Sequence, residues 1–275
     1  MADVRVVISG ASGLIGTALH DALVARGDAV VPLRRGVDWD PAARRLDPAL
    51  LAGADAVVNL SGASIGRVPW TTAWRRTLRT SRIDATETIV AAIAALPAAD
   101  RPRVLANASG ITRPGGLLAS IVREWEDAAA RAPVPTVLLR TGIVVSPSGG
   151  AFAPLRALTR AGLGGRLGPG SQHWPWISLR DEVAGILHCL DRGLHGPVHF
   201  AGPTPATAAE CLRALARRHR RPYWLPAPSW ALRLALGEMA DELLLVDAAT
   251  VPRELLDSGF SFQDETIEAA LRAPA

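Results

Sequence analysis

Residues Val4–Gly16 run Val-Arg-Val-Val-Ile-Ser-Gly-Ala-Ser-Gly-Leu-Ile-Gly, a β-branched segment that leads into a glycine-rich turn. A helical pattern follows the turn as far as Arg26. In such a strand–turn–helix unit Gly10 permits the tight turn, Gly13 lets the backbone approach a pyrophosphate, and Gly16 lets the helix pack closely. The first amides of the helix would face the phosphate charge. A plain strand-to-helix turn is the alternative, but the context favours a nucleotide site.

The next strand pattern points to the type of nucleotide. Ala29–Leu33 predicts a strand, and Arg34 and Arg35 follow it, about twenty residues after the glycines. NAD-binding units usually place an acid there to accept the ribose 2′-hydroxyl, whereas a basic residue accommodates a 2′-phosphate. No acid occurs between Val30 and Val37. The pattern therefore predicts NADP(H) as the cofactor. The alternative is that Arg34 and Arg35 are solvated loop residues with no role in binding.

Strand and helix patterns alternate along the first part of the chain, which predicts an α/β protein with a doubly wound parallel sheet of the Rossmann type. From Ser146 onward Gly, Pro and Trp become more frequent. We expect a Rossmann domain over residues 1–165, with its sheet completed by residues near 181–202. A smaller substrate-binding domain is expected over residues 166–275.

Composition narrows the class further. The 275 residues are 49% hydrophobic and 20% charged, which is typical of a globular protein. All 30 basic residues are arginines, and they are scattered among acids, so the net charge of +4 does not indicate nucleic-acid binding. Cys189 and Cys211 have no metal-site or disulfide spacing, and no metal is expected. We expect a cytoplasmic protein with a small-molecule substrate, no nucleic-acid or membrane partner, and a homodimer as one candidate assembly.

Further motifs give the chain a resemblance to a known family. They are the glycine turn, Asn59–Gly62, Ser81–Arg82, Trp125–Glu126, Leu139–Gly142, Gly168–Gln172 and the tail Pro222–Leu271. With them the chain resembles an atypical or extended short-chain dehydrogenase/reductase of the NAD(P)-dependent epimerase/dehydratase type. It is most similar to the nucleoside-diphosphate-sugar epimerase-like subgroup, which has a C-terminal domain of unknown function. The resemblance implies a Rossmann fold and a nucleotide cofactor, and leaves the substrate open.

The departure from the superfamily concerns its catalytic pair. Redox members use Tyr-x-x-x-Lys, in which a tyrosinate acts as acid and base and the lysine lowers its pKa. This sequence has no lysine, and its single tyrosine, Tyr223, lies in the tail. The segment Ser109–Gly116 also lacks the two tyrosines that the subgroup usually shows, and the loop that leads to a helix at Ser120 is short.

Three residues are candidates for the missing chemistry. Ser109, where the superfamily has its catalytic Ser or Thr, could hydrogen-bond a substrate carbonyl, and Thr112 is a second candidate of the same kind. His173 could replace the tyrosine as proton donor, because imidazole is the side chain best suited to proton transfer near neutral pH. The structural alternatives are a serine at a strand end that bonds local backbone and a solvated histidine in a loop.

The expected cofactor site gathers residues from several strand ends. Arg82 could meet an anionic substrate or a phosphate, or form an ion pair with Asp84 or Glu87, and Arg140 could bridge the sheet and the cofactor. The expected cofactor-binding residues are Gly10, Ser12, Gly13, Leu14, Ile15, Gly16, Arg34, Arg35, Leu60, Ser61, Gly62, Arg82 and Arg140.

The expected function is that of an NADP(H)-binding oxidoreductase or epimerase that acts on a small organic substrate. Two alternatives remain open. One is a non-redox cyclase, isomerase or dehydratase built on the same fold, and the other is a non-catalytic NADPH-binding protein.

Overall fold

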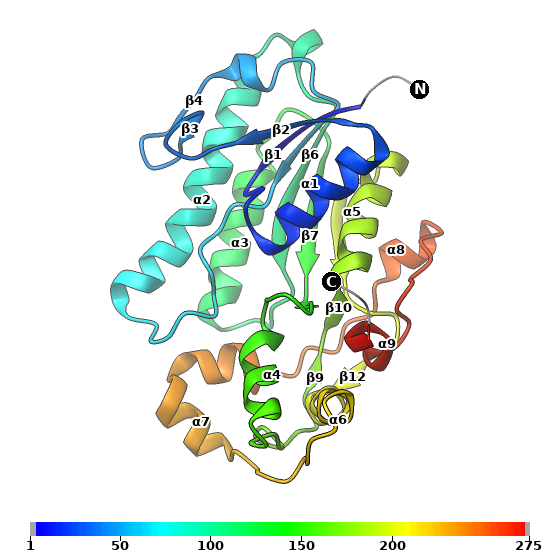
Figure 1. Ribbon diagram of the computed structural model, residues 1–275. Coiled ribbons are helices and arrows are strands. Elements are labelled where there is room, and N and C mark those ends of the chain that lie inside the picture. The colour runs from blue at the N-terminus through cyan, green and yellow to red at the C-terminus, as the bar shows by residue number, and fades with distance from the viewer. Residues whose placement is uncertain (1–3, 273–275) are drawn as a thin grey trace.

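The computed structural model describes residues 4–272, which form a central parallel sheet with a smaller body beneath it (Figure 1). The sheet strands are β1 (Arg5–Ser9), β2 (Ala29–Leu33), β5 (Ala56–Asn59), β6 (Val104–Gly110), β7 (Thr136–Thr141) and β11 (Gly196–Phe200). They lie in the order β11-β7-β6-β5-β1-β2, and every neighbouring pair is parallel. The doubly wound Rossmann sheet predicted from the sequence is confirmed.

The strand order reverses at β1. The chain passes from β1 to β2 on one side and then returns to β5 on the other side of β1. In open α/β sheets a ligand binds outside the carboxyl ends of the strands at such a switch point. The ends of β1 and β5 are therefore the expected position of the nucleotide, and the glycine turn leaves β1 there.

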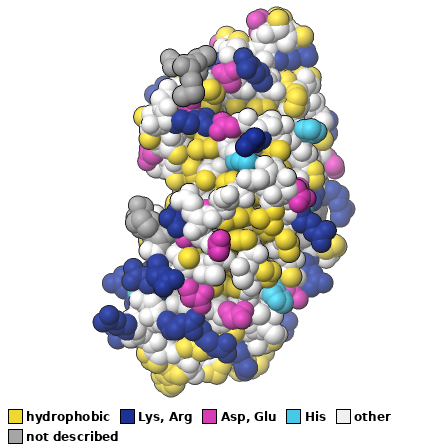
Figure 2. All heavy atoms as spheres, turned by 90° about the vertical axis from the view of Figure 1, so that its right-hand side faces the viewer, with side chains coloured by type: hydrophobic (Ala, Val, Ile, Leu, Met, Phe, Trp, Pro, Cys, Tyr) yellow, Lys and Arg dark blue, Asp and Glu magenta, His cyan; other side chains and the backbone are white. Residues whose placement is uncertain are grey.

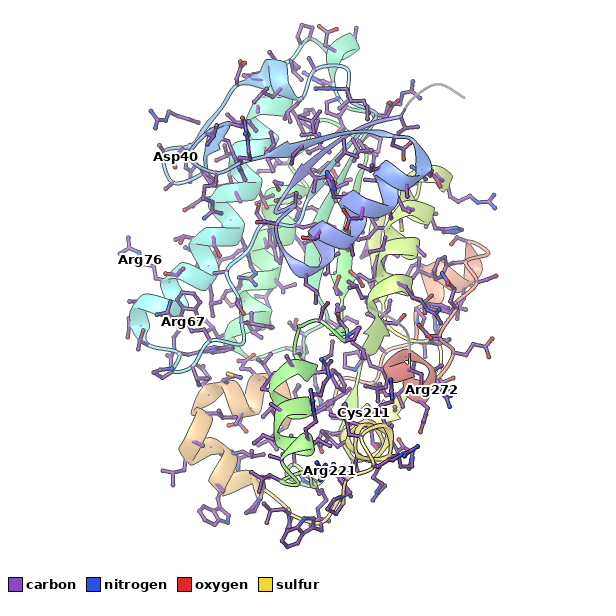
Figure 3. The ribbon with its side chains drawn as sticks, in the orientation of Figure 1. Asp40, Arg67, Arg76, Cys211, Arg221 and Arg272 are labelled. Atoms are coloured by element: carbon purple, nitrogen blue, oxygen red, sulfur yellow. The ribbon has the colours of Figure 1, made fainter. Side chains whose placement is uncertain are left out.

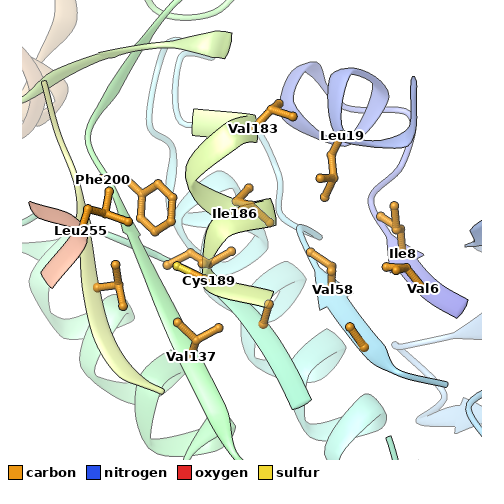
Figure 4. Close-up of a cluster of buried hydrophobic side chains, with 14 of the residues drawn as sticks. Val6, Ile8, Leu19, Val58, Val137, Val183, Ile186, Cys189, Phe200 and Leu255 are labelled. Atoms are coloured by element: carbon orange, nitrogen blue, oxygen red, sulfur yellow. The ribbon is translucent and has the colours of Figure 1, made fainter. Parts of the chain in front are cut away.

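Two pairs of helices cover the sheet (Figure 1). Helices α1 (Leu14–Arg26) and α5 (Leu179–Arg192) lie on one face, and α2 (Thr72–Ala95) and α3 (Leu117–Ala129) lie on the other. Side chains of β1 alternate between the faces, because Val6 and Ile8 pack on α1 and α5 whereas Val7 packs on α2. Figure 4 shows the first of these cores, in which Leu19 and Ile186 meet the sheet.

The remaining elements build the lower body and the connections. The strands are β3 (Trp39–Asp40), β4 (Arg45–Leu46), β8 (Ile143–Val145), β9 (His173–Trp174), β10 (Trp176–Ser178) and β12 (Ala206–Thr207). The α-helices are α4 (Phe152–Arg160), α6 (Ala208–Arg218), α7 (Ser229–Leu236), α8 (Arg253–Asp257) and α9 (Ile267–Arg272). Short helical turns are η1 (Pro48–Leu50), η2 (Ala98–Asp100) and the π-helical η3 (Ala240–Leu244). Within residues 4–272 no helix is long and apolar enough to span a membrane.

The lower body has its own core and touches the helices above it. Trp174 and Trp176 are buried there with Phe152. The carboxylate of Glu242 in η3 accepts hydrogen bonds from the backbone amides of Leu117 (2.6 Å) and Leu118 (3.3 Å), the first residues of α3. Because those amides have no partner within their own helix, the tail supplies the cap of α3.

A buried polar network joins three strands to two helices below the carboxyl edge of the sheet. Ser9 donates to Oδ1 of Asn59 (2.6 Å), and Nδ2 of Asn59 donates to Asn107 (2.7 Å) and to Thr86 (2.9 Å). The indole nitrogen of Trp125 also donates to Oγ1 of Thr86 (2.8 Å). Thr86 is therefore the shared acceptor that ties α2 to both β5 and α3.

Replacing Thr86 with valine should destabilise the protein strongly. The substitution keeps the shape but removes the acceptor of two buried donors, and each such loss costs about 1–3 kcal/mol. We expect Thr86→Val to lower the free energy of unfolding by about 2–4 kcal/mol in urea denaturation. Thr77→Val on the exposed part of α2 is the control, with a change below about 0.5 kcal/mol. Equal stability of the two variants would contradict this role of the network.

Candidate cofactor and active site

The glycine turn after β1 forms a cradle that leaves no room for side chains. Gly10 has a φ of +77°, and a Cβ there would lie 2.7 Å from the carbonyl carbon of Leu60. A Cβ at Gly16 would collide with the carbonyl oxygen of Gly10. Helix α1 begins after Gly13 with no side-chain cap from the described residues and no acid in its first turn. The first amides of α1, from Leu14 and Ile15, are therefore available to an anion at the switch point.

The two arginines after β2 differ in their surroundings. Arg34 donates from its backbone amide (2.7 Å) and from Nε (3.0 Å) to Asp38, and these bonds hold the pKa of that carboxyl below its usual value. Arg35 is exposed and forms no ion pair with any residue between 4 and 272. Arg35 is thus the cation of the two that is free to meet a phosphate.

Arg82 lies beside the Ser61–Gly62 turn and is largely buried. Its guanidinium donates to the backbone carbonyls of Leu78 (2.9 Å) and Ala63 (3.0 Å) and lies 5.3 Å from the ring centroid of Trp125. Burial lowers the pKa of Arg82 to about 10. The ion pair with Asp84 or Glu87 considered from the sequence is not formed, since both acids face Arg44. Arg82 therefore keeps its charge uncompensated by any described carboxylate at the edge of the site.

Ser109 and Arg140 meet at one carboxylate. Ser109 pairs with Arg140 in the β6–β7 register, and its hydroxyl donates to Oε1 of Glu126 on α3 (2.6 Å). Arg140 donates to both oxygens of Glu126, each at 2.8 Å. Burial alone would raise the pKa of Glu126, but the hydrogen bonds from Arg140 and Ser109 outweigh it and lower the pKa. Glu126 is therefore an ionised acceptor on a partly buried face of α3.

His173 belongs to the lower body. It lies in β9, where its backbone amide (2.8 Å) and ring Nδ1 (3.0 Å) both contact Oδ1 of Asp247, and these bonds lower the pKa of that carboxyl. An ionised carboxylate on Nδ1 favours the tautomer that carries its proton there and leaves Nε2 free. No hydrogen bond joins His173 to Ser109 or Thr112 within the described residues, so the three candidates do not form one hydrogen-bonded cluster.

A further carboxyl group lies under the end of β7. Glu182, in the first turn of α5, is fully buried and accepts a hydrogen bond from Thr141 (2.7 Å) through Oε1. Its second oxygen, Oε2, has no partner in the described part of the chain. Burial raises the pKa of Glu182 to about 8, against the smaller lowering effect of Thr141.

Sequence reasoning missed Glu126, Asp247 and Glu182 as members of these contacts. The Trp125–Glu126 motif was a usable signal, because adjacent helical residues point in different directions and Trp125 was an obvious core residue. No comparable signal marked Asp247, which lies 74 residues from its partner.

The fold and the glycine cradle define a Rossmann dinucleotide-binding protein. Residues 227–273 match a family model described as "Domain of unknown function (DUF1731)". The epimerase family protein Mb2239 of Mycobacterium bovis is 40% identical over 98% of this chain and 97% of its own length. The epimerase family protein SDR39U1 of Homo sapiens is 31% identical over 98% of both chains.

Solved structures agree with these relatives. The crystal structure of human SDR39U1 (isoform 2) with NADPH superimposes with a TM-score of 0.87 at 28% identity and covers 98% of each chain. A nucleoside-diphosphate sugar epimerase from Corynebacterium glutamicum gives 0.77 at 25% identity, over 98% of this chain and 57% of that one. The chain belongs to this epimerase family, an atypical branch of the short-chain dehydrogenases/reductases.

Glu182 should make stability depend on pH. A carboxyl whose pKa is raised on folding stabilises the protein fully below its unfolded pKa of about 4.5 and loses that contribution as pH rises towards 8. The loss amounts to at most about 1.4 kcal/mol per pH unit across this window. Glu182→Gln keeps the acceptor for Thr141 and should abolish the loss, so the variant should gain stability relative to wild type between pH 5 and pH 8 in thermal unfolding.

The exposed Glu265→Gln serves as the matched control. It should follow the wild-type pH profile within error. Parallel profiles for wild type and Glu182→Gln would show that Glu182 is ionised in the folded protein.

Proposed function

We propose that the protein is an NADP(H)-dependent oxidoreductase or epimerase that acts on a small organic substrate without the usual tyrosine–lysine pair. The glycine cradle at the β1–β5 switch point is the observation that carries this proposal. The complex of the human relative with NADPH supports the choice of cofactor.

The residues at the switch point suit the pyrophosphate and the 2′-phosphate of this cofactor. The turn at Gly10 and Gly13 and the first amides of α1 would bind the pyrophosphate, and Arg35 would bind the 2′-phosphate. Leu60–Gly62 would border the cofactor where β5 ends. When bound, NADP(H) supplies or accepts a hydride.

The proton must come from a different residue than in typical family members. The hydroxyl proton of Ser109 points at Glu126, so this serine cannot donate it to a substrate in the same arrangement. We assign the donor role to Nε2 of His173, with Asp247 fixing the tautomer. Reduction of an activated alkene or an imine depends less on a strong acid than reduction of a ketone, and fits such a site better.

A non-redox reaction is the second candidate, an isomerisation, cyclisation or elimination at the same site. The position of the single tyrosine favours this second candidate. Tyr223 packs under Arg213 in the lower body, so it does not replace the acid that a reductase of this family uses.

Cofactor binding should discriminate between the two dinucleotides. We expect NADPH to bind more tightly than NADH in calorimetry, and Arg35→Ala to weaken NADPH about tenfold while leaving NADH unchanged. Arg34→Ala should have a smaller effect, because Asp38 already neutralises Arg34. Arg45→Ala, an exposed arginine paired with Asp40, is the control. Equal affinity for both dinucleotides would refute the assignment of the 2′-phosphate.

Turnover should depend on His173. For a reductase, screening carbonyl compounds, imines and activated alkenes should reveal stoichiometric NADPH consumption, and His173→Gln should lower kcat about a hundredfold. His195→Gln, on an exposed histidine, should leave kcat unchanged. Product formation without net NADPH consumption would exclude a reductase. Transfer of deuterium from labelled NADPH into the product would then separate an epimerase from the non-redox candidate, for which no label is transferred.

A further inference from the structure

A group of cationic side chains gathers on the lower body (Figure 2). The sequence concentrates charge there, since residues 208–234 hold six arginines and one glutamate. Figure 2 shows the arginines crowded at the lower end of this face, and Figure 3 labels Arg221 and Arg272 on either side of Cys211 of α6. The elements involved are α4, α6 and α9.

Part of this group surrounds a hollow. It has a volume of about 230 Å³ and opens between the end of β8, α4, α6 and α9. Its lining includes Val145, Arg156, Leu215, Arg218, His219 and Leu271. None of these residues belongs to the glycine cradle, and none is His173 or Asp247. The hollow thus combines cations on its walls with an apolar floor.

The charges around the hollow lack counterions among the described residues. Arg156 donates to the backbone carbonyls of Ser146 and Pro147, and it forms no ion pair in residues 4–272, nor do Arg160 and Arg218. The neighbouring Arg217 behaves differently, because it pairs with Glu268 at 2.7 Å. Glu268 is the acid of α9 nearest in sequence to the hollow. Because it already pairs with Arg217, it does not neutralise the arginines around the hollow.

The pKa values of His219 and Arg156 shift in the direction expected for crowded cations. Burial, together with Arg160, Arg156 and Arg218, lowers the pKa of His219. Burial and then Arg160 lower the pKa of Arg156. Like charges therefore repel one another here, and a bound anion would relieve that repulsion.

We propose that this hollow is a second binding site, which takes the phosphate group of a small phosphorylated organic molecule. Arg218 and His219 bind the phosphate oxygens, with Arg156 and Arg160 adding charge. Val145, Leu215 and Leu271 contact the apolar part of the ligand. The small volume of the hollow and its apolar floor favour a compact phosphate ester over an extended polyanion such as nucleic acid, which needs a continuous basic surface.

The test uses phenyl phosphate and inorganic phosphate as probes, with sodium chloride at matched ionic strength as the reference. Calorimetry on the full chain should show binding of phenyl phosphate several-fold tighter than that of inorganic phosphate, because the ring covers the apolar floor. Arg218→Ala should weaken both about tenfold. Arg217→Ala, the adjacent arginine that does not line the hollow, should change neither more than twofold.

Nuclear magnetic resonance of the histidine rings locates the ligand. Phosphate should raise the pKa of His219 in the wild type, because a nearby anion stabilises the imidazolium, and Arg218→Ala should need about tenfold more phosphate for the same rise. NADPH affinity should be the same in both proteins, which separates this site from the cofactor site. No phosphate binding beyond the chloride reference, equal losses in Arg217→Ala and Arg218→Ala, or binding without a response of His219 would overturn the proposal.

Discussion

The approach of the Gly10 turn to the end of β5 is the contact on which the site depends. A side chain at Gly10 would press on the carbonyl group of Leu60, and one at Gly16 would press on Gly10 itself. Because neither position carries one, α1 can begin directly above the crevice between β1 and β5. The uncapped amides of α1 then point at the place where the strand order reverses. The absence of side chains at Gly10 and Gly16 thus allows both the packing of α1 and the approach of a ligand.

The polar network below this contact fixes the strand ends in register. Asn59 and Asn107 are buried neighbours in β5 and β6, and Thr86 receives bonds from Asn59 and from Trp125. Trp125 is anchored inside, so the next residue of α3, Glu126, turns towards Ser109 and Arg140. The network therefore determines where the carboxylate beside the site lies, although none of its members needs to contact a ligand.

The sequence predicts what is encoded locally. The strand, turn and helix of Val4–Arg26 are contiguous, and the alternation that follows identifies the parallel sheet. The partners of the polar residues are not local: Glu126 lies 17 residues from Ser109, and Asp247 lies 74 residues from His173. The burial of Glu126 becomes visible only once the register of β6 and β7 is known. Asp38 was missed as a partner of Arg34 because it follows the acid-free stretch by one residue.

The C-terminal segment contacts the end of the short loop that joins β6 to α3. Glu242 caps α3 where that loop ends, Glu238 pairs with Arg75 at the start of α2 (3.0 Å), and Asp247 holds His173. All three acids lie inside the segment 227–273 that the family model matches. In the upper body Ser109 and Arg140 are both bound to Glu126, so neither is free to act as an acid. A proton donor on the lower body would then be useful only if that body were fixed against α2 and α3, and the contacts of Glu238 and Glu242 provide this fixation.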